Sequence, residues 1–378
     1  MSDKTNVASH IHKNLVLVIN DLKAGGAQRV LTTLANAWSG QGRQVCIITL
    51  AGSDTDFFPL EDGVRRIAIG RPRRSRTRLS GCMRSLRRIA ALRRSLQQST
   101  PAVIVSFLPV MNILTVLAAA GLGCPVVLCE RNDPGRQELK WPWGLLRRRL
   151  YRRADIITAN SRGVLDTLGA YVPENRLSFV PNPVTVTAVP ARTGGDAAAI
   201  LAVGRLVYQK AYDILLEAFA RIAPAHPDWR LDIIGDGPLK NALYLQAQQL
   251  GIGARVAFHG TVADPFPYYR SAAVYVLPSR FEGMPNALLE AMACGLPAIV
   301  SSASPGPLEY VRHGQTGLVV PPEDSAALAG ALQLLIGDPD LRRRLGAAAA
   351  SCLTGCTLQE VLQVWEDILT RLPDIQGR

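Results

Sequence analysis

Aromatic residues are scarce in this sequence, and acidic residues are missing from one long stretch of it. Of 378 residues, 6% are aromatic, 48% hydrophobic and 19% charged, which is typical of a globular protein and excludes disordered chains, collagen and small disulfide scaffolds. Residues 63–129 contain no Asp or Glu but twelve Arg, so this stretch accounts for the whole net charge of +12. A local basic segment on an otherwise neutral chain indicates that one face meets an anionic surface.

The sequence also lacks the patterns that mark metal sites, export and membrane spans. The seven cysteines include no C-x-x-C pair, and we expect reduced core thiols in a cytosolic protein. The histidines have no metal-ligand spacing, and the D-x-D of Asp54 and Asp56 lies in a polar loop, so no metal site is predicted. The polar amino terminus predicts no signal peptide. Residues 97–129 carry no charge, but proline and glycine divide them into a predicted strand, helix and strand.

Short runs of Val, Ile and Leu alternate with helical patterns along the chain. Such runs predict parallel strands that are buried on both faces, and a Pro- and Gly-containing stretch near 182–196 divides them into two series. The sequence therefore predicts an α/β protein with two Rossmann-like, doubly wound parallel-sheet domains, residues 1–185 and 186–356, facing each other across a cleft, followed by a helix in 357–378. Ligands bind beyond the carboxyl ends of strands in such sheets, so the loops after strands hold the candidate site.

Two carboxylates frame one predicted helix. Glu282 and Glu290 lie in FEGMPNALLEAMACG, where the pattern predicts a helix that begins near Pro285 and ends at Gly295. Glu290 is placed to accept hydrogen bonds from ribose hydroxyls, and Glu282 is placed to hold a transferred sugar. Taken alone, the pattern favours the alternative, in which Glu290 is a solvated helix position and Glu282 a loop carboxylate. A helix amino terminus also offers N–H groups to a diphosphate, here from the backbone of Gly283, Met284, Pro285 and Asn286.

Two cations and a glycine pair follow other predicted strands. Arg205 and Lys210 lie in GRLVYQKAYD, after the strand AAILAVG, where fixed donors would stabilise the charge that grows on a leaving diphosphate. An ordinary surface pair before a helix is the alternative. Gly25 and Gly26, between the first strand and first helix, would let the backbone approach a phosphate, although a Gly-Gly turn by itself is weak evidence.

Together these motifs resemble glycosyltransferase family 4 over nearly the whole chain. The motifs fall in the family's order: GGAQRV, CERNDP, ADIITANS, VPNPV, GRLVYQKAYD, GDGP, FEGMPNALLEAMACGLP and GPLEYVRHGQTGLVVPPED. The resemblance implies a GT-B fold and transfer from a nucleotide sugar with retention of anomeric configuration, without a metal or other cofactor. It also implies that the carboxyl-terminal helix crosses back onto the first domain.

The resemblance assigns roles residue by residue. It implies that Arg205 and Lys210 contact the diphosphate, that Glu290 contacts the ribose and that Glu282 contacts the donor sugar, which makes Glu282, Arg205 and Lys210 the candidate catalytic residues. The loop of Gly25 and Gly26 would close near the phosphates. The strand end with His259 and Gly260 would lie near the base.

The chain departs from the family pattern in two places. The usual glycine after the motif lysine is Ala211, which should be tolerated if its φ is negative. No histidine lies between His12 and His226, so a catalytic group from the first domain stays unassigned. The candidates for polar contacts on the acceptor side are Asn112, Glu130, Arg131 and Asn132.

The basic segment is predicted to form an amphipathic helix. Most of its arginines gather on one side of a helical wheel and its apolar residues on the other, although Arg93 falls on the apolar side. Arg84, Arg87, Arg88 and Arg94 lie opposite Cys82, Met83, Leu86, Ile89, Ala90 and Leu96. A second basic cluster, residues 147–153, follows Trp141 and Trp143, side chains suited to the interface between water and lipid. We expect contact with an anionic membrane surface, the alternative being a solvated face.

These features predict a peripheral protein on the cytoplasmic face of the cell membrane. The resemblance is closest to bacterial transferases that extend polyprenyl-diphosphate-linked oligosaccharides. It implies transfer of a hexose or N-acetylhexosamine from a UDP-sugar to a polyprenyl-diphosphate-linked sugar in surface polysaccharide or glycan assembly, without a nucleic-acid partner. The alternative is a non-catalytic membrane- or nucleic-acid-binding protein that uses the arginines, although these lack interleaved aromatic residues for stacking on bases. An oxidoreductase is disfavoured because no G-x-G-x-x-G follows the first strand.

Overall fold

The computed structural model describes residues 12–70, 78–137, 139–184 and 198–373. The chain forms two compact units. Unit 1 comprises Met1–Asn160, Val164–Pro183 and Gln359–Arg378, and unit 2 comprises Ser161–Gly163 and Val184–Leu358.

Unit 1 is built on a parallel sheet. In its described part, seven strands pair in the order β3-β2-β1-β4-β5-β6-β7, so the strand order reverses between β1 and β4. The central strands are buried on both faces, as continuous apolar runs predict. The strands are β1 (Asn14–Ile19), β2 (Gln44–Thr49), β3 (Val64–Ala68), β4 (Val103–Phe107), β5 (Val126–Glu130), β6 (Ile156–Ala159) and β7 (Leu177–Phe179).

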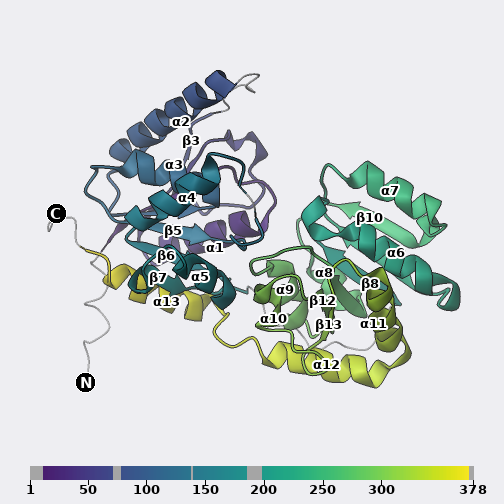
Figure 1. Ribbon diagram of the computed structural model, residues 1–378. Coiled ribbons are helices and arrows are strands. Elements are labelled where there is room, and N and C mark those ends of the chain that lie inside the picture. Colours follow the sequence, from purple (N-terminus) through teal and green to yellow (C-terminus); the bar gives the residue numbers. More distant parts are fainter. Residues whose placement is uncertain (1–11, 71–77, 138, 185–197, 374–378) are drawn as a thin grey trace, which may run out of the picture. The chain divides into compact units, whose positions relative to one another are not determined.

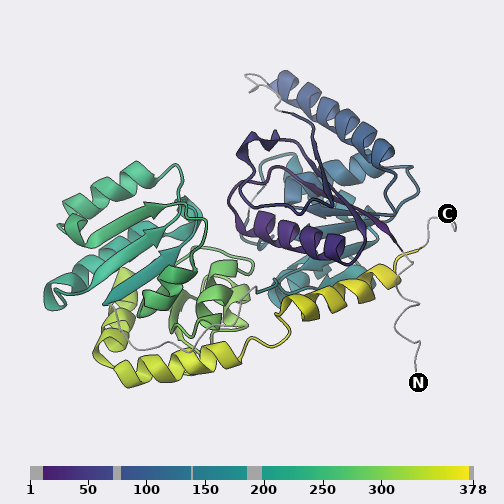
Figure 2. The same ribbon diagram turned by 180° about the vertical axis from the view of Figure 1, so that it is seen from behind.

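Helices cover both faces of this sheet. The helices α2, α3 and α4 lie on one face (Figure 1), and α1 and α13 lie on the other (Figure 2). The uncharged stretch 97–129 holds β4, α3 and β5, which confirms the predicted strand, helix and strand. Within the described ranges, we find no helix with the length and hydropathy needed to span a bilayer. The helices of unit 1 are α1 (Gly26–Gly40), α2 (Arg78–Ser99), α3 (Pro109–Ala119), α4 (Trp143–Leu150), α5 (Arg162–Gly169) and α13 (Leu358–Thr370).

Unit 2 repeats this arrangement. Six strands of its described part pair in the order β10-β9-β8-β11-β12-β13, again all parallel, with the reversal between β8 and β11. Two doubly wound α/β units confirm the predicted fold class. The strands are β8 (Ala199–Val203), β9 (Arg230–Ile234), β10 (Val256–Gly260), β11 (Val274–Leu277), β12 (Ala298–Ser301) and β13 (Leu318–Val320).

Two apolar layers hold the helices of unit 2 against its sheet. One layer contains side chains of α6 (Tyr212–Ile222), α7 (Lys240–Gln249) and α11 (Ser325–Gly337). The other contains side chains of α8 (Phe266–Ser271), α9 (Asn286–Ala293) and α12 (Pro339–Ser351). A short helix, α10 (Pro305–Leu308), follows β12. Single 3-10 turns occur at Ser53–Thr55, Tyr151–Arg153, Glu174–Arg176, Tyr208–Lys210, Ala223–Ala225 and Gly253–Arg255.

The carboxyl-terminal helix α13 belongs to unit 1 although it follows unit 2 in the chain. Its Trp365 is fully buried and meets Trp38 of α1 edge to face, with ring centroids 5.4 Å apart. Arg43 and Glu366 form an ion pair beside this contact. Large buried aromatic side chains contribute strongly to packing, so α13 completes the core on this face of unit 1.

We predict that Trp365→Ala destabilises unit 1. The change removes the aromatic contact with Trp38 and leaves a cavity, so the free energy of unfolding should fall by about 3–5 kcal/mol. Urea denaturation followed by circular dichroism measures this effect. The exposed Gln363 on the same helix is the control, because its replacement by Ala should change stability by less than about 0.5 kcal/mol. Equal stability of the two variants would contradict the packing role of α13.

Candidate active site

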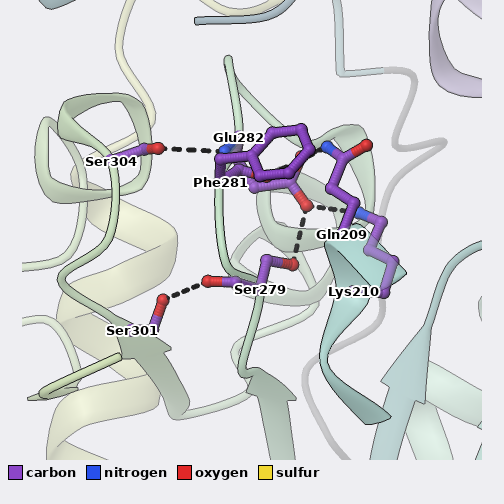
Figure 3. Close-up of polar contacts among 7 residues, drawn as sticks. All are labelled: Gln209, Lys210, Ser279, Phe281, Glu282, Ser301 and Ser304. Carbon is purple, nitrogen blue, oxygen red and sulfur yellow. Dashed lines mark hydrogen bonds and ion pairs between the residues drawn. The ribbon is translucent and has the colours of Figure 1, made fainter. Parts of the chain in front are cut away.

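The carboxyl ends of β8 and β11 bring two predicted site residues together in unit 2. These neighbouring strands flank the point at which the strand order reverses. The loops that follow them lead to opposite sides of the sheet, and in such sheets ligands bind in the crevice between these loops. Lys210, in the loop after β8, places Nζ 2.5 Å from Oε1 of Glu282, in the loop after β11 (Figure 3). Their side chains are only 14% and 8% exposed. The pair is therefore a shielded ion pair at the expected place.

Further hydrogen bonds hold the Glu282 carboxylate (Figure 3). Ser279 donates from Oγ to Oε1 at 2.7 Å, and Gln209 donates from Nε2 to Oε2 at 3.4 Å and to the Phe281 carbonyl at 2.9 Å. The backbone N–H of Glu282 donates to Oγ of Ser304 at 3.0 Å. Groups from the loops after β8 and β11 thus orient the carboxylate, and Ser304 fixes its backbone, as expected for a preorganised binding group.

Two buried tyrosines lie close to this carboxylate. Burial raises the pKa of Tyr212, and the negative charge of Glu282 raises it further. Burial likewise raises the pKa of Tyr275, with Tyr212, Glu282 and Glu290 adding to the effect. Both tyrosines therefore stay uncharged, and the ionic partner of Glu282 among the described residues is Lys210.

Glycines allow the loop that carries Arg205 to pack closely on the GDGP turn. A Cβ on Gly235 would lie 2.0 Å from the Gly204 carbonyl oxygen, and one on Gly237 would lie 2.4 Å from that of Leu206. Leu206 N–H donates to the Asp236 carbonyl at 2.9 Å, which fixes the loop. The Arg205 side chain is exposed, and no described residue hydrogen bonds or pairs with it. The sequence pattern included GDGP without predicting that it supports the Arg205 loop.

The helix α9 begins and ends where the sequence predicts. It starts at Asn286, no side chain caps its amino end at Pro285, and Gly295 beyond its carboxyl end has a φ of +70°. Glu290 is 5% exposed and accepts a hydrogen bond from Tyr269 Oη to Oε2 at 3.0 Å. It is therefore not a solvated helix position. Gly283 approaches the α10 backbone so closely that a Cβ on Gly306 would lie 1.7 Å from the Gly283 carbonyl oxygen.

The two residues predicted near the base differ in their surroundings. Gly260 ends β10 with a φ of +69°, and its carbonyl accepts a hydrogen bond from Gly235 N–H at 2.8 Å, beside the GDGP turn. The His259 ring binds Asp232 on β9, with Nε2 and Oδ1 2.9 Å apart, and lies against the ring of Tyr268 with centroids 4.8 Å apart. Sequence reasoning missed Asp232, which lies inside a strand without any motif around it.

The condition under which alanine should be tolerated at position 211 is not met. The φ of Ala211 is +50° with ψ +39°, the left-handed region. The reason is the tight turn between the 3-10 turn that carries Lys210 and the start of α6. A left-handed alanine costs about 1–2 kcal/mol because its Cβ crowds the following carbonyl.

In unit 1, Gly25 directly precedes α1 and Gly26 is its first residue. A Cβ on Gly25 would lie 2.4 Å from Oε1 of Gln28, whose Nε2 donates to Asp21 at 3.0 Å. The loop after β1 is therefore braced by side chains of its own unit, at the edge of the sheet where its strand order reverses.

Three of the four acceptor-side candidates contribute to one buried region of unit 1. Tyr151 donates from Oη to Oε2 of the fully buried Glu130 at 2.9 Å, and Asn112 donates from Nδ2 to Tyr151 Oη at 3.1 Å. Arg131, 7% exposed, donates from Nη1 to Asn182 Oδ1 at 2.9 Å. Burial raises the pKa of Glu130, although Arg147 and the Tyr151 hydrogen bond oppose the rise. Asn132 is half-buried.

Arg147 is not part of the surface cluster in which the sequence placed it. It is 7% exposed and donates from Nη2 to the Pro134 carbonyl at 2.9 Å, close to Glu130. A buried carboxylate requires a nearby positive charge or donors, which explains why one arginine of a basic run turns inward. Tyr151, which donates to Glu130, carried no recognisable signal in the sequence.

The helix α2 buries only part of the side that the helical wheel predicted to be apolar. Leu96 of that side is fully buried, as is Leu92, whereas Met83 is 55% and Leu86 is 62% exposed. Arg87, Ala90 and Arg94 share the exposed face, and Arg84 and Arg88 are half-buried. Burial and the neighbouring Arg84 lower the pKa of Arg88. Near α4, Trp141 is 85% and Leu145 is 47% exposed, while Trp143 packs against the core.

Comparison with known proteins agrees with this geometry. The chain matches the family model described as glycosyl transferases group 1 over residues 190–351 and that of a glycosyl transferase 4-like domain over residues 25–183. The chain is a glycosyltransferase, with a 4-like domain followed by a group 1 domain.

Two relatives of this glycosyltransferase differ in how much of their length is shared. An exopolysaccharide phosphotransferase of Streptomyces coelicolor is 36% identical over 208 residues, which are 55% of this chain but only 22% of that protein. A Campylobacter jejuni enzyme is named as an alpha-1,4-N-acetyl-D-galactosaminyltransferase that acts on a diphospho-undecaprenol-linked glycan. It is 27% identical over 356 residues, 94% of this chain and 98% of its own.

Solved structures show that this glycosyltransferase has the GT-B fold. A sucrose-phosphate synthase of Thermosynechococcus elongatus superposes with a TM-score of 0.80 at 21% identity, covering 94% of this chain and 98% of that one. The HepE protein of Anabaena, in complex with UDP, superposes with a TM-score of 0.75 at 17% identity, covering 94% and 99%.

We predict that Ala211→Gly stabilises the glycosyltransferase. Glycine removes the Cβ crowding at a φ of +50°, and its greater entropy in the unfolded chain offsets part of the gain, so stability should rise by up to about 1 kcal/mol. Ala220→Gly in the interior of α6 is the matched control and should lower stability by about 1 kcal/mol. Thermal unfolding compares them, and a loss of stability in both variants would contradict the left-handed conformation.

Proposed function

We propose that this glycosyltransferase moves a hexose or N-acetylhexosamine from a UDP-sugar to a polyprenyl-diphosphate-linked sugar, with retention of configuration, during surface polysaccharide or glycan assembly. The observation that carries the proposal is the shielded pair of Lys210 and Glu282 at the strand-order reversal of unit 2. It joins a cation suited to a diphosphate with a carboxylate suited to sugar hydroxyls.

The reaction uses these groups as follows. Lys210 and Arg205 bind the diphosphate and stabilise the charge that it gains as its bond to the anomeric carbon breaks. The acceptor hydroxyl attacks that carbon from the same face, and a leaving phosphate oxygen takes its proton. Glu282 holds the donor sugar, and Glu290 accepts hydrogen bonds from the ribose. No step requires a metal ion, and the UDP in the HepE structure supports a uridine donor.

The acceptor part of the proposal rests on unit 1 and on a relative. The Campylobacter enzyme is named for an undecaprenol-linked glycan, and it aligns with nearly all of this chain. Glu130 ends β5, and Arg131 and Asn132 follow it, at the edge where a ligand of unit 1 would bind. Asn112, on α3, donates a hydrogen bond to the Cys129 carbonyl of the same strand. We assign these residues to the acceptor side.

The membrane part of the proposal rests on the exposed face of α2. Apolar Met83 and Leu86 share this face with Arg87 and Arg94, and exposed Trp141 lies before α4. Apolar side chains among cations suit the headgroup region of an anionic bilayer, where the methylenes leave water and the guanidinium groups meet phosphate. We therefore place the enzyme on the cytoplasmic membrane surface, with Arg84, Arg88 and Trp143 behind the contact face.

A donor screen tests the catalytic proposal. Purified enzyme is incubated with UDP-, GDP- and ADP-sugars and a membrane lipid extract, and release of free nucleotide is measured with and without a chelator. We expect lipid-dependent release from one UDP-sugar, unaffected by the chelator. Glu282→Gln should reduce it by about 100-fold or more, because a preorganised polar group is lost.

The control for this screen is Glu217→Gln. Glu217 is a half-buried residue of α6, and its replacement should leave the rate unchanged. Release from a GDP- or ADP-sugar alone would overturn the uridine donor. No release from any donor, together with no thermal stabilisation by any free nucleotide, would overturn the catalytic proposal.

Vesicle sedimentation tests the membrane contact. Arg87→Gln with Arg94→Gln should weaken binding to vesicles that contain phosphatidylglycerol by about tenfold or more, since each basic residue near an anionic surface contributes about 1 kcal/mol. Met83→Ser with Leu86→Ser should also weaken it. Leu334→Ser, at an exposed position of unit 2, is the control and should bind as the unchanged protein does. Full binding by both double variants would exclude the α2 face.

A further inference from the structure

Arg280 connects the two loops that carry Lys210 and Glu282. It lies after β11, two residues before Glu282, and reaches back to the first turn of α6. Its Nη1 and Nη2 donate to Oδ1 and Oδ2 of Asp213 at 3.0 and 2.6 Å, and its side chain is only 10% exposed. This is a bidentate ion pair, the geometry in which a guanidinium fixes both the distance and the orientation of a carboxylate.

The remaining contacts of Arg280 tie it to the same loop. Its backbone N–H donates to the Gln209 carbonyl at 2.8 Å, and Nη1 donates to the Tyr208 carbonyl at 2.8 Å. The guanidinium lies over the Tyr208 ring, 4.1 Å from its centroid. Nε pairs with Glu323 at 2.8 Å, but that carboxylate is 57% exposed and contributes little. Arg280 thus holds the residues on both sides of Lys210.

The chemistry of the pair makes Arg280 difficult to replace. Hydrogen bonding to Asp213 raises the pKa of Arg280 despite its partial burial, so the cation persists. A lysine would keep the charge but would lose the planar fork and the stacking on Tyr208. Asp213 ends the motif GRLVYQKAYD, in which the sequence assigned roles to Arg205 and Lys210 but none to this acid.

We propose that Arg280 is a positioning residue for the donor site and that Asp213 is its partner. By joining the loops after β8 and β11, the pair keeps the Lys210 ammonium within reach of the Glu282 carboxylate and aligned for the donor. Arg280 itself touches neither donor nor acceptor. The proposal rests on the proposed function for its effect on transfer, but its effect on Lys210 is independent of any activity.

Lysine reactivity measures the effect on Lys210 directly. The full-length protein is treated with acetic anhydride, and acetylation of Lys210 is followed by mass spectrometry, with Lys240 of the same unit as internal reference. Asp213→Asn and Arg280→Ala should each raise Lys210 acetylation by about threefold or more, because the ammonium leaves Glu282 more often. Arg343→Ala, which removes an exposed arginine paired with Asp340, should not change it.

Asp213→Asn keeps the experiment informative if Arg280→Ala folds poorly, because Asp213 is 41% exposed and its replacement is nearly isosteric. Thermal unfolding confirms that each variant is folded. A Lys210 acetylation rate that stays at the unchanged level in Asp213→Asn and in folded Arg280→Ala would overturn the proposal.

Kinetics separates positioning from general stability. With the UDP-sugar identified in the screen, Arg280→Ala should lower kcat by about 10- to 100-fold, the range caused by misplaced reacting groups, with a smaller change in the donor KM. Arg280→Lys should recover little. Replacing both Arg280 and Asp213 by Ala should cost no more than the single change, because the two residues act as one unit. If the loss of kcat in the double variant equals the combined losses of the two single variants, the proposal is overturned.

The two proposals fail separately. A wild-type enzyme that releases no nucleotide from any donor would overturn the proposed function, while the acetylation of Lys210 would still decide the role of Arg280. A wild-type enzyme that is active, with kcat unchanged in Arg280→Ala and Arg280→Lys, would leave the function standing and overturn the positioning role.

Discussion

The ion pair of Lys210 and Glu282 is the interaction on which the candidate site depends. Two opposite charges that are largely removed from water are stable only with good geometry and further hydrogen bonds, which Ser279 and Gln209 supply. That requirement explains the surrounding structure. The loops after β8 and β11 must converge, Gly204 must leave room for the Lys210 side chain, and Ala211 must adopt a left-handed turn.

The two units share a sheet order around the strand reversal, but their charged groups differ. At the carboxyl edge of the unit 2 sheet, a cation and a carboxylate meet as a fixed pair. In unit 1, burial around Glu130 raises the pKa of the carboxyl group, and hydroxyl and amide groups surround it. Exposed positive charge of unit 1 lies instead on α2, at Arg87 and Arg94 beside Met83 and Leu86, and at the arginines of residues 148–153. These differences are the basis on which we propose a donor site in unit 2 and an acceptor surface in unit 1.

Much of the architecture followed from local pattern. Unbroken apolar runs predicted the buried parallel strands, and proline and glycine correctly divided residues 97–129 into β4, α3 and β5. The helix at Asn286 and its end at Gly295 were also correct. The helical wheel of α2 was less informative, because it ranks faces by composition alone. Which face is buried depends on the neighbouring sheet and α3, and these select Leu92 and Leu96 over Met83 and Leu86.

The sequence by itself determined the family, the strand and helix pattern and the identity of the charged motif residues, because each depends on residues close together in the chain. Tertiary structure decided which of those residues meet. Asp213 and Arg280 are 67 residues apart, Asp232 and His259 are 27 apart, and Arg147 belongs by sequence to a surface cluster. No local signal encodes such contacts, because they arise only when the strands pair and the helices pack, which brings residues far apart in the chain together.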